Sequence, residues 1–218
     1  MCGIVGYLGK GQAYPALIKG LKRLEYRGYD SAGVALISED GSLNVYKAKG
    51  KVADLEAYCA DKDLSGSVGI AHTRWATHGE PSSVNAHPHY SSSKNLAIIH
   101  NGIIENYREL IADYDLADTL KSETDSEVVA ALLNRFYEGK PEEAIKKTVS
   151  KLKGTFALVI LFEDQKDVIY STRNVSPIVA TICKEGAMLA SDLTALCRFT
   201  NRYFVVPEYH ILKLSADK

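Results

Sequence analysis

Cys2-Gly3-Ile4-Val5-Gly6 begins the chain directly after Met1. The apolar run from Gly3 to Leu8 predicts a short strand, and glycine in a strand often marks a close approach by another backbone or a ligand. Removal of Met1 would leave Cys2 with both a thiol and a free α-amino group. Because an α-amine (pKa roughly 7.7–8.0) can accept the proton of a thiol (pKa roughly 8.5), nucleophile and base would then share one residue. The alternative is that Cys2 is only a small residue at the start of a buried strand.

Outward from this strand, the pattern alternates between helical and extended periods. Leu17, Leu21 and Leu24 have helical spacing behind Pro15, a favoured first-turn residue, and predict a helix. The runs from Ala32 to Ile37 and from Leu43 to Ala48 are rich in strand formers. The polar turn Glu39-Asp40-Gly41 separates these two runs, so they predict an antiparallel hairpin.

The remaining elements favour an α+β fold with largely antiparallel sheets, because the strands follow one another by turns more often than by helical crossovers. The expected elements are a short helix from Val52 to Ala60, strands at Val68–Ala71, Leu96–His100, Phe156–Phe162, Val168–Ser171, Ile178–Ile182 and Met188–Ala190, and two to three helices between Asn106 and Leu152. No internal repeat or low-complexity segment interrupts them.

Length and composition favour one domain spanning residues 1–218, since 218 residues with 46% hydrophobic content can bury a substantial core. Lysine plus arginine (26) nearly balances aspartate plus glutamate (27), so neither nucleic acid nor an anionic membrane is an expected partner. No run approaches the roughly 20 apolar residues of a membrane span, and no signal peptide is evident, so we expect a soluble, cytoplasmic protein. Cys59, Cys183 and Cys197 have apolar neighbours and are expected to be reduced core residues.

The stretch from Thr73 to Lys94 is polar and has no hydrophobic periodicity. A loop of about 20 residues within a domain is usually functional or disordered, and the tryptophan and histidines here favour function. Imidazoles also raise the possibility of a metal site. The spacing matches no H-E-x-x-H or cysteine–histidine ligand set, so we expect no metal and no cofactor. The histidines concerned are His72, His78, His87, His89 and His100.

Five segments in this order resemble the class II glutamine amidotransferases, and within them the glutaminase domain of the glucosamine-6-phosphate synthases. The segments are Cys2-Gly3-Ile4-Val5-Gly6, Tyr26-Arg27-Gly28-Tyr29-Asp30-Ser31-Ala32-Gly33, His72-Thr73-Arg74-Trp75-Ala76-Thr77-His78-Gly79, His100-Asn101-Gly102-Ile103-Ile104-Glu105-Asn106-Tyr107 and Glu123-Thr124-Asp125-Ser126-Glu127. The resemblance covers nearly the whole chain. It implies an N-terminal-nucleophile hydrolase fold, an αββα sandwich of two stacked sheets flanked by helices, and L-glutamine as substrate.

The resemblance also assigns roles to charged residues. Arg74, whose guanidinium fork suits a carboxylate, would bind the α-carboxylate of glutamine; an isolated surface ion pair is the alternative. Thr124-x-x-Glu127 is a capping-box pattern that places Asp125 in the first turn of a helix, where an acid is favourable without any ligand. The resemblance implies instead that Asp125 holds the α-ammonium. Arg27 would help to position Cys2, or form an ordinary structural ion pair.

Asn101-Gly102 has a complete structural explanation as a type I′ hairpin turn. The resemblance implies another role, in which the Asn101 side-chain N–H and the Gly102 backbone N–H stabilise the oxyanion that forms when Cys2 attacks the amide. Gly28 and Asp30 are interpreted as turn-building residues. The resemblance further implies that Trp75 gates ammonia, that Thr77 and His78 contact the substrate, and that His87 shapes the loop.

In the family, ammonia passes to a C-terminal sugar isomerase domain that binds fructose 6-phosphate, and the full-length enzyme is expected to be a homodimer. We expect the sequence ending at Lys218 to lack that domain. Two other functions stay open: a different class II amidotransferase or N-terminal-nucleophile amidohydrolase acting on another amide, and a glutamine-sensing module without turnover. A retained Met1 would bury the α-amine in a peptide bond, so the active form is expected to lack it.

Overall fold

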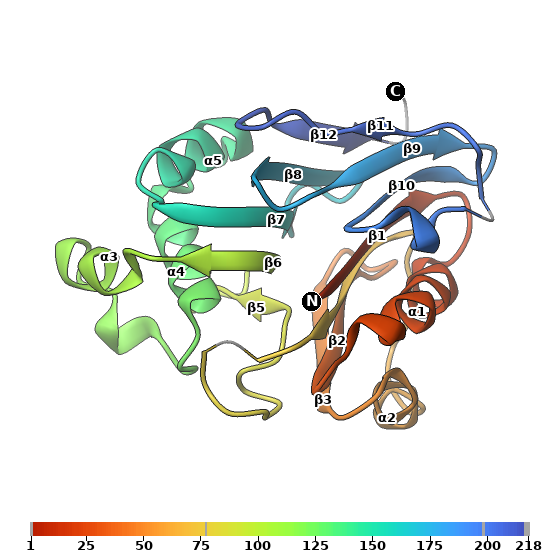
Figure 1. The fold of residues 1–218 in the computed structure, drawn as a ribbon, viewed down its shortest axis with the longest axis horizontal. Coiled ribbons are helices and arrows are strands. Elements are labelled where there is room, and N and C mark those ends of the chain that lie inside the picture. The colour runs from red at the N-terminus through yellow and green to blue at the C-terminus, as the bar shows by residue number, and fades with distance from the viewer. Residues whose placement is uncertain (1, 77, 198, 216–218) are drawn as a thin grey trace.

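The computed structural model describes residues 2–76, 78–197 and 199–215, and arranges them in four layers (Figure 1). Two sheets stack face to face, and helices cover both outer faces. The helices are α1 (Ala13–Leu24), α2 (Val52–Tyr58), α3 (Tyr107–Asp113), α4 (Asp125–Phe136) and α5 (Pro141–Val149), with 3₁₀ turns at Glu25–Arg27, Ala117–Thr119 and Leu193–Ala195. The expected αββα sandwich is therefore confirmed.

The larger sheet has seven strands in the order β11-β9-β10-β1-β4-β2-β3, and every pairing in it is antiparallel. Its strands are β1 (Gly3–Gly9), β2 (Ser31–Ile37), β3 (Leu43–Lys49), β4 (Val68–Arg74), β9 (Val179–Cys183), β10 (Gly186–Ala190) and β11 (Phe204–Val205). Because β1 lies between β10 and β4, the segment after Cys2 is held on both edges.

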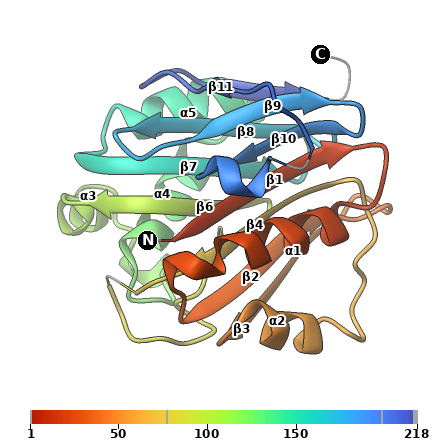
Figure 2. The ribbon, with the colours of Figure 1, turned by 45° about the vertical axis from the view of Figure 1, so that its right-hand side comes forward.

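The smaller sheet has five strands in the order β12-β8-β7-β6-β5, also antiparallel. Its strands are β5 (His89–Tyr90), β6 (Leu96–Ile104), β7 (Gly154–Phe162), β8 (Val168–Asn174) and β12 (Leu212–Ser215). Helices α3 to α5 cover its outer face, while α1 and α2 cover the outer face of the larger sheet (Figure 2).

Strand alternation explains how β1 serves two cores at once. Val5 and Tyr7 point to the layer of α1 and α2, whereas Ile4 and Leu8 point to the apolar layer between the sheets. All four side chains are buried. A Cβ on Gly3 would lie 2.5 Å from Oγ1 of Thr73 and 3.0 Å from Cβ of Leu24, so the glycine that follows Cys2 permits the close approach that the sequence indicated.

The sequence placed most elements correctly, including the hairpin of β2 and β3, but several boundaries differ. The stretch from Thr73 to Lys94 is not wholly a loop, because Gly3 and Ala32 both pair with Thr73 and keep it within β4. The short strand β5 also lies inside it. Strands β11 and β12 were missed because they have only two and four residues and no clear alternation of buried positions.

The prediction for the cysteines is only partly right. Cys59 is buried in the core under α1 and α2. Cys183 is half-buried and Cys197 is exposed, because Cys183 ends the β9 strand and Cys197 lies just past a 3₁₀ turn. Among the described helices, none is long and apolar enough to cross a membrane.

Candidate active site

A cavity of about 360 Å³ opens where β1, β4 and β6 meet the start of α4. This volume lies within the roughly 300–1,000 Å³ typical of small-molecule sites. Its lining is Cys2, Arg27, Arg74, Trp75, His78, His87, His100, Asn101, Gly102, Ile103, Thr124, Asp125, Ser126, Thr155, Ser176 and Pro177. Every site residue expected from the sequence is among them except Thr77, which lies outside the described residues.

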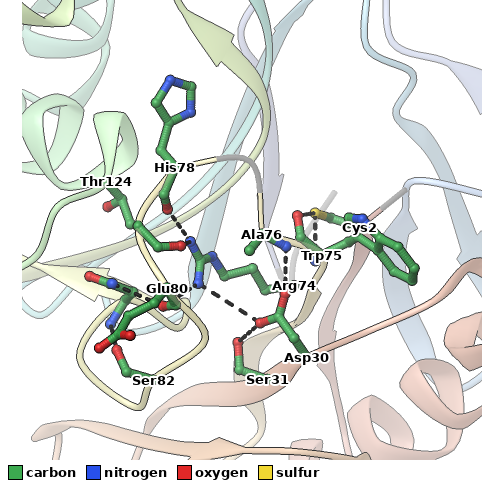
Figure 3. Close-up of polar contacts among 12 residues, drawn as sticks. Cys2, Asp30, Ser31, Arg74, Trp75, Ala76, His78, Glu80, Ser82 and Thr124 are labelled. Atoms are coloured by element: carbon green, nitrogen blue, oxygen red, sulfur yellow. Dashed lines mark hydrogen bonds and ion pairs between the residues drawn. The ribbon is translucent and has the colours of Figure 1, made fainter.

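The Cys2 thiol is hydrogen-bonded to the backbone of Trp75 (Figure 3). Its Sγ accepts a hydrogen bond from the Trp75 N–H at 3.2 Å and lies 3.5 Å from the Trp75 carbonyl oxygen. Burial raises the pKa of the thiol, and the hydrogen bond from Trp75 partly offsets this. The thiol is thus protonated at neutral pH and needs a base to become a nucleophile.

Asn101 and Gly102 are not a hairpin turn, so that interpretation is wrong. Both lie within β6, where they pair with Ala157 and Phe156 of β7. The Asn101 side-chain Nδ2 donates to the Cys2 carbonyl at 3.1 Å, which places this amide beside the thiol-bearing residue. Gly102 has φ +135°, and a Cβ there would lie 2.0 Å from the Thr155 carbonyl oxygen, so only glycine fits this backbone.

Arg74 ends β4 and is buried. Its Nη1 donates to the Glu80 carbonyl at 3.3 Å, and its Nη2 donates to the carbonyls of Gly79 at 3.1 Å and of His78. These bonds hold the backbone of residues 78–80 against the guanidinium, and His78 also lines the cavity. A substrate carboxylate could be bound in bidentate fashion only by displacing some of these carbonyls.

Asp30 has a larger part than a turn-building residue, and in this respect the sequence interpretation is incomplete. Figure 3 shows its carboxylate between Ser31, Ala76 and Arg74. It accepts from the Ala76 N–H at 2.5 Å and lies 3.8 Å from Nη1 of Arg74. Asp30 therefore fixes both the guanidinium of Arg74 and the backbone of Ala76.

Asp125 is the first residue of α4 and is buried at the cavity wall. Its Oδ2 accepts from the Ile104 N–H at 2.7 Å, which ties the helix start to β6. Thr124 caps the helix by accepting from the Glu127 N–H at 3.2 Å, as the capping-box pattern predicts. The other half of the box differs, because the Glu127 carboxylate binds the N–H groups of residues 121 and 122 instead of that of Thr124.

The supporting residues also reach the cavity. Arg27, with a side chain only 8% exposed, forms an ion pair with Asp192 at 3.3 Å, so a structural ion pair and a place in the site coexist. The His78 ring meets the ring of Tyr107 edge-on at 5.7 Å. Ser176 and Pro177, which follow β8, were not anticipated, because nothing in the local sequence shows that this turn reaches Cys2.

Three of the histidines, His72, His87 and His89, lie in a row with tilted and edge-on rings, not as a ligand cluster. The ring of His87 lies 4.2 Å from that of His72 and 4.7 Å from that of His89. Within the described part of the chain, no group of three or more histidine, cysteine or acidic side chains is placed to hold a metal ion.

Comparison with known families gives a match over more than half of the chain. The model of the family described as "Glutamine amidotransferase domain" matches residues 72–198. A glutamine–fructose-6-phosphate aminotransferase (isomerizing) of Bacteroides thetaiotaomicron is 50% identical over 222 residues, covering 100% of this chain and 36% of the relative. The enzyme of the same name from Halalkalibacterium halodurans is 46% identical, with the same coverage. The chain thus spans about a third of the length of these relatives.

Solved structures show the same fold at lower identity. The glutamine phosphoribosylpyrophosphate amidotransferase of B. subtilis, in complex with ADP and GMP, superposes with a TM-score of 0.84 at 24% identity, covering 99% of this chain and 48% of that one. A glutamine aminotransferase class-II domain protein from Silicibacter pomeroyi superposes with a TM-score of 0.67 at 16% identity, covering 99% and 96% of the two chains.

Proposed function

This chain belongs to the glutamine amidotransferase family, and we propose that it hydrolyses L-glutamine to glutamate and ammonia through a γ-glutamyl thioester on Cys2. The observation that carries the proposal is that the Cys2 thiol, which is hydrogen-bonded to the Trp75 backbone, lines the same cavity as two candidate oxyanion donors. The Asn101 amide nitrogen lies 3.1 Å from the Cys2 carbonyl oxygen, and Gly102 follows at the same cavity wall.

The proposed reaction has two halves. The Cys2 thiolate attacks the δ-carbonyl carbon of glutamine, and N–H groups of Asn101 and Gly102 stabilise the oxyanion. Collapse of this intermediate breaks the C–N bond and releases ammonia, which receives its proton from the Cys2 α-ammonium. Water, deprotonated by the same amine, then attacks the thioester. The C–S bond breaks, glutamate leaves, and the thiol is restored.

The raised pKa of the Cys2 thiol explains why the amine matters. A thiol whose anion is disfavoured by burial needs a base close by, and in this site the Cys2 α-amine would be that base. The amine exists only after Met1 is removed, so the active species is the processed chain.

Substrate orientation would come from two charged ends. Arg74 offers a guanidinium to the α-carboxylate, and Asp125 offers a carboxylate to the α-ammonium. The Arg74 fork now holds carbonyls of the loop at residues 78–80, so binding and loop position are linked. Trp75, which is 55% exposed, lies at the mouth beside Cys2, where it could gate the passage of ammonia.

In our proposal, the ammonia is used by a part of the protein outside this chain. Because this chain covers only 36% of its aminotransferase relatives, we propose that a further domain takes the ammonia to fructose 6-phosphate and forms glucosamine 6-phosphate. A homodimeric, cytoplasmic full-length enzyme is part of the same proposal.

The test is the substitution Cys2→Ala. Glutamate release should cease while glutamine still binds, and intact mass after treatment with a glutamine-like electrophile should show one label on a chain without Met1. Hydrolysis retained by Cys2→Ala would refute the proposal. Faster turnover of asparagine or acylated amides than of glutamine would indicate another amidohydrolase, and binding without turnover by the unmodified, processed chain would indicate a sensing module.

A further inference from the structure

A fully buried histidine, His72, contacts the side-chain amide oxygen of Asn101. His72 lies on β4, two residues before Arg74. Its Nε2 is 2.9 Å from Oδ1 of Asn101 and 3.1 Å from the His100 carbonyl oxygen. His72 therefore contacts the oxygen of the Asn101 amide, whose nitrogen, the proposed oxyanion donor, bonds the Cys2 carbonyl.

The chemistry of these contacts determines which atoms carry hydrogen. The His100 carbonyl can only accept, so Nε2 of His72 must be the protonated nitrogen. A donor at Nε2 requires that the Asn101 atom facing it be the oxygen. At the other end of the same amide, the Cys2 carbonyl can only accept, so the Asn101 atom facing it must be the nitrogen. The two contacts independently fix the same orientation of the amide.

The His72 ring is suited to hold one tautomer. Burial lowers the pKa of His72 to about 3, so the imidazole is neutral near pH 7. Its Nδ1 has no hydrogen-bond partner among the described residues, and the ring of His87 lies 4.2 Å away. No described contact therefore favours moving the proton to Nδ1.

We propose that His72 is a positioning residue for glutamine hydrolysis, whose Nε2–H keeps the nitrogen of the Asn101 amide directed at the oxyanion. One N–H of that amide bonds the Cys2 carbonyl, which leaves the other for the developing negative charge. A reversed amide would present oxygen to the oxyanion and exchange a stabilising donor for a repulsion. The proposal rests on the proposed function of Cys2.

The test uses three substitutions that differ in where they place a donor. The side-chain nitrogen of His72→Gln can occupy the place of Nε2, that of His72→Asn reaches only the place of Nδ1, and His72→Phe has none. We expect His72→Asn and His72→Phe to lower kcat for glutamine about tenfold to a hundredfold with little change in KM. His72→Gln should recover most of the loss. Equal losses for His72→Gln and His72→Asn would overturn the proposal.

A double-mutant cycle separates positioning from general damage. If His72 acts through Asn101, then in an Asn101→Ala background His72→Phe should cost no further activity. His89→Gln is the matched control, since His89 is also buried in the row but bonds Thr124 and not Asn101. Its effect should multiply with that of Asn101→Ala. An undiminished loss from His72→Phe in the double variant would overturn the proposal.

Two further measurements keep the outcomes distinct. Nitrogen NMR should show the His72 proton on Nε2, which does not depend on activity, and a proton on Nδ1 would refute the inference. Alkylation of Cys2 by a small haloacetamide, which needs no oxyanion hole, should be unchanged in the His72 variants. Retained hydrolysis in Cys2→Ala would refute the proposed function itself, whereas inactive Cys2→Ala with additive His72 and Asn101 effects would refute only this inference.

Discussion

The indole ring of Trp75 lies in the space that any side chain on Gly28 would occupy. A Cβ at position 28 would come within 2.1 Å of both Cε3 and Cζ3 of the ring, and Gly28 has φ +90°. The backbone of Trp75 also bonds the Cys2 thiol. The absence of a side chain at Gly28 therefore makes room for the indole beside the Cys2 thiol, which the interpretation of Gly28 as a turn residue did not include.

The substitution Gly28→Ala should displace the indole. Trp75 is the only tryptophan in the chain, so its fluorescence reports this displacement directly. We expect a changed emission maximum and a reduced kcat for glutamine, together with a loss of stability of about 1 kcal/mol from the positive φ. Steady-state fluorescence and initial rates are the measurements.

Gly139→Ala is the matched control. Gly139 also has a positive φ, +76°, but a Cβ there would have nothing within 4 Å. It should lose comparable stability and leave fluorescence and rate unchanged. If Gly28→Ala resembled Gly139→Ala in all three measurements, the close packing of the Trp75 indole against Gly28 would have no functional role.

The substitution Asp30→Asn should weaken glutamine binding. It removes the charge that faces Arg74 and weakens the bond to the Ala76 N–H, and hydrogen bonds to charged groups contribute about 1.5–3 kcal/mol. We expect KM for glutamine to rise about tenfold or more. Asp40→Asn, in the exposed turn of the β2–β3 hairpin, is the control and should leave KM unaltered. An unaltered KM in Asp30→Asn would show that Arg74 holds the loop without it.

The substitution Asp125→Asn should act on one end of the substrate. The amide oxygen can still accept from the Ile104 N–H, so the fold should be kept. We expect KM for glutamine to rise about tenfold to a hundredfold. Hydrolysis of glutaramate, which is glutamine without its α-amino group, should be unaffected. An equal loss with both substrates would mean that Asp125 does not hold the α-ammonium.

Most helices and strands of this fold could be predicted from the sequence, because helix and strand formation depends mainly on residues that are close together in the chain. The apolar run at β1 and the hairpin of β2 and β3 follow from alternation and turn residues. The same reliance on local pattern gave a wrong prediction at Asn101-Gly102, because this dipeptide favours a hairpin turn in isolation. Pairing with β7 overrides that preference and keeps β6 extended through Ile104.

The residues that local pattern alone could not assign act across the chain. Asp30 meets Arg74 because Ser31 and Arg74 pair in neighbouring strands, and His72 meets Asn101 because the two sheets stack. Both contacts join residues that are far apart in the sequence, so no hydrophobic periodicity predicts them. The resemblance to a family supplied most of the residues that line the cavity, and the structure adds those that contact and hold them.

The buried histidines should make the fold sensitive to acid. Burial lowers the pKa of His72 to about 3 and holds those of His87 and His89 well below 6.5, the ordinary value. Between these limits the unfolded chain binds protons that the folded chain does not. The free energy of unfolding should therefore decrease as pH falls below about 6.5, by about 1.4 kcal/mol per pH unit for each such histidine.

Urea unfolding between pH 7.5 and pH 5 measures this slope, and His89→Gln tests its origin. Glutamine can still donate to Oγ1 of Thr124 but takes up no proton, so one histidine's share of the slope should disappear. Near pH 7.5, where the buried imidazoles of His72, His87 and His89 are neutral in the folded and unfolded states, the free energies of unfolding of the two chains should differ far less in their pH dependence. A slope unchanged by His89→Gln would mean that His89 does not contribute, and stability that rises on acidification would contradict the burial of neutral imidazoles behind the site.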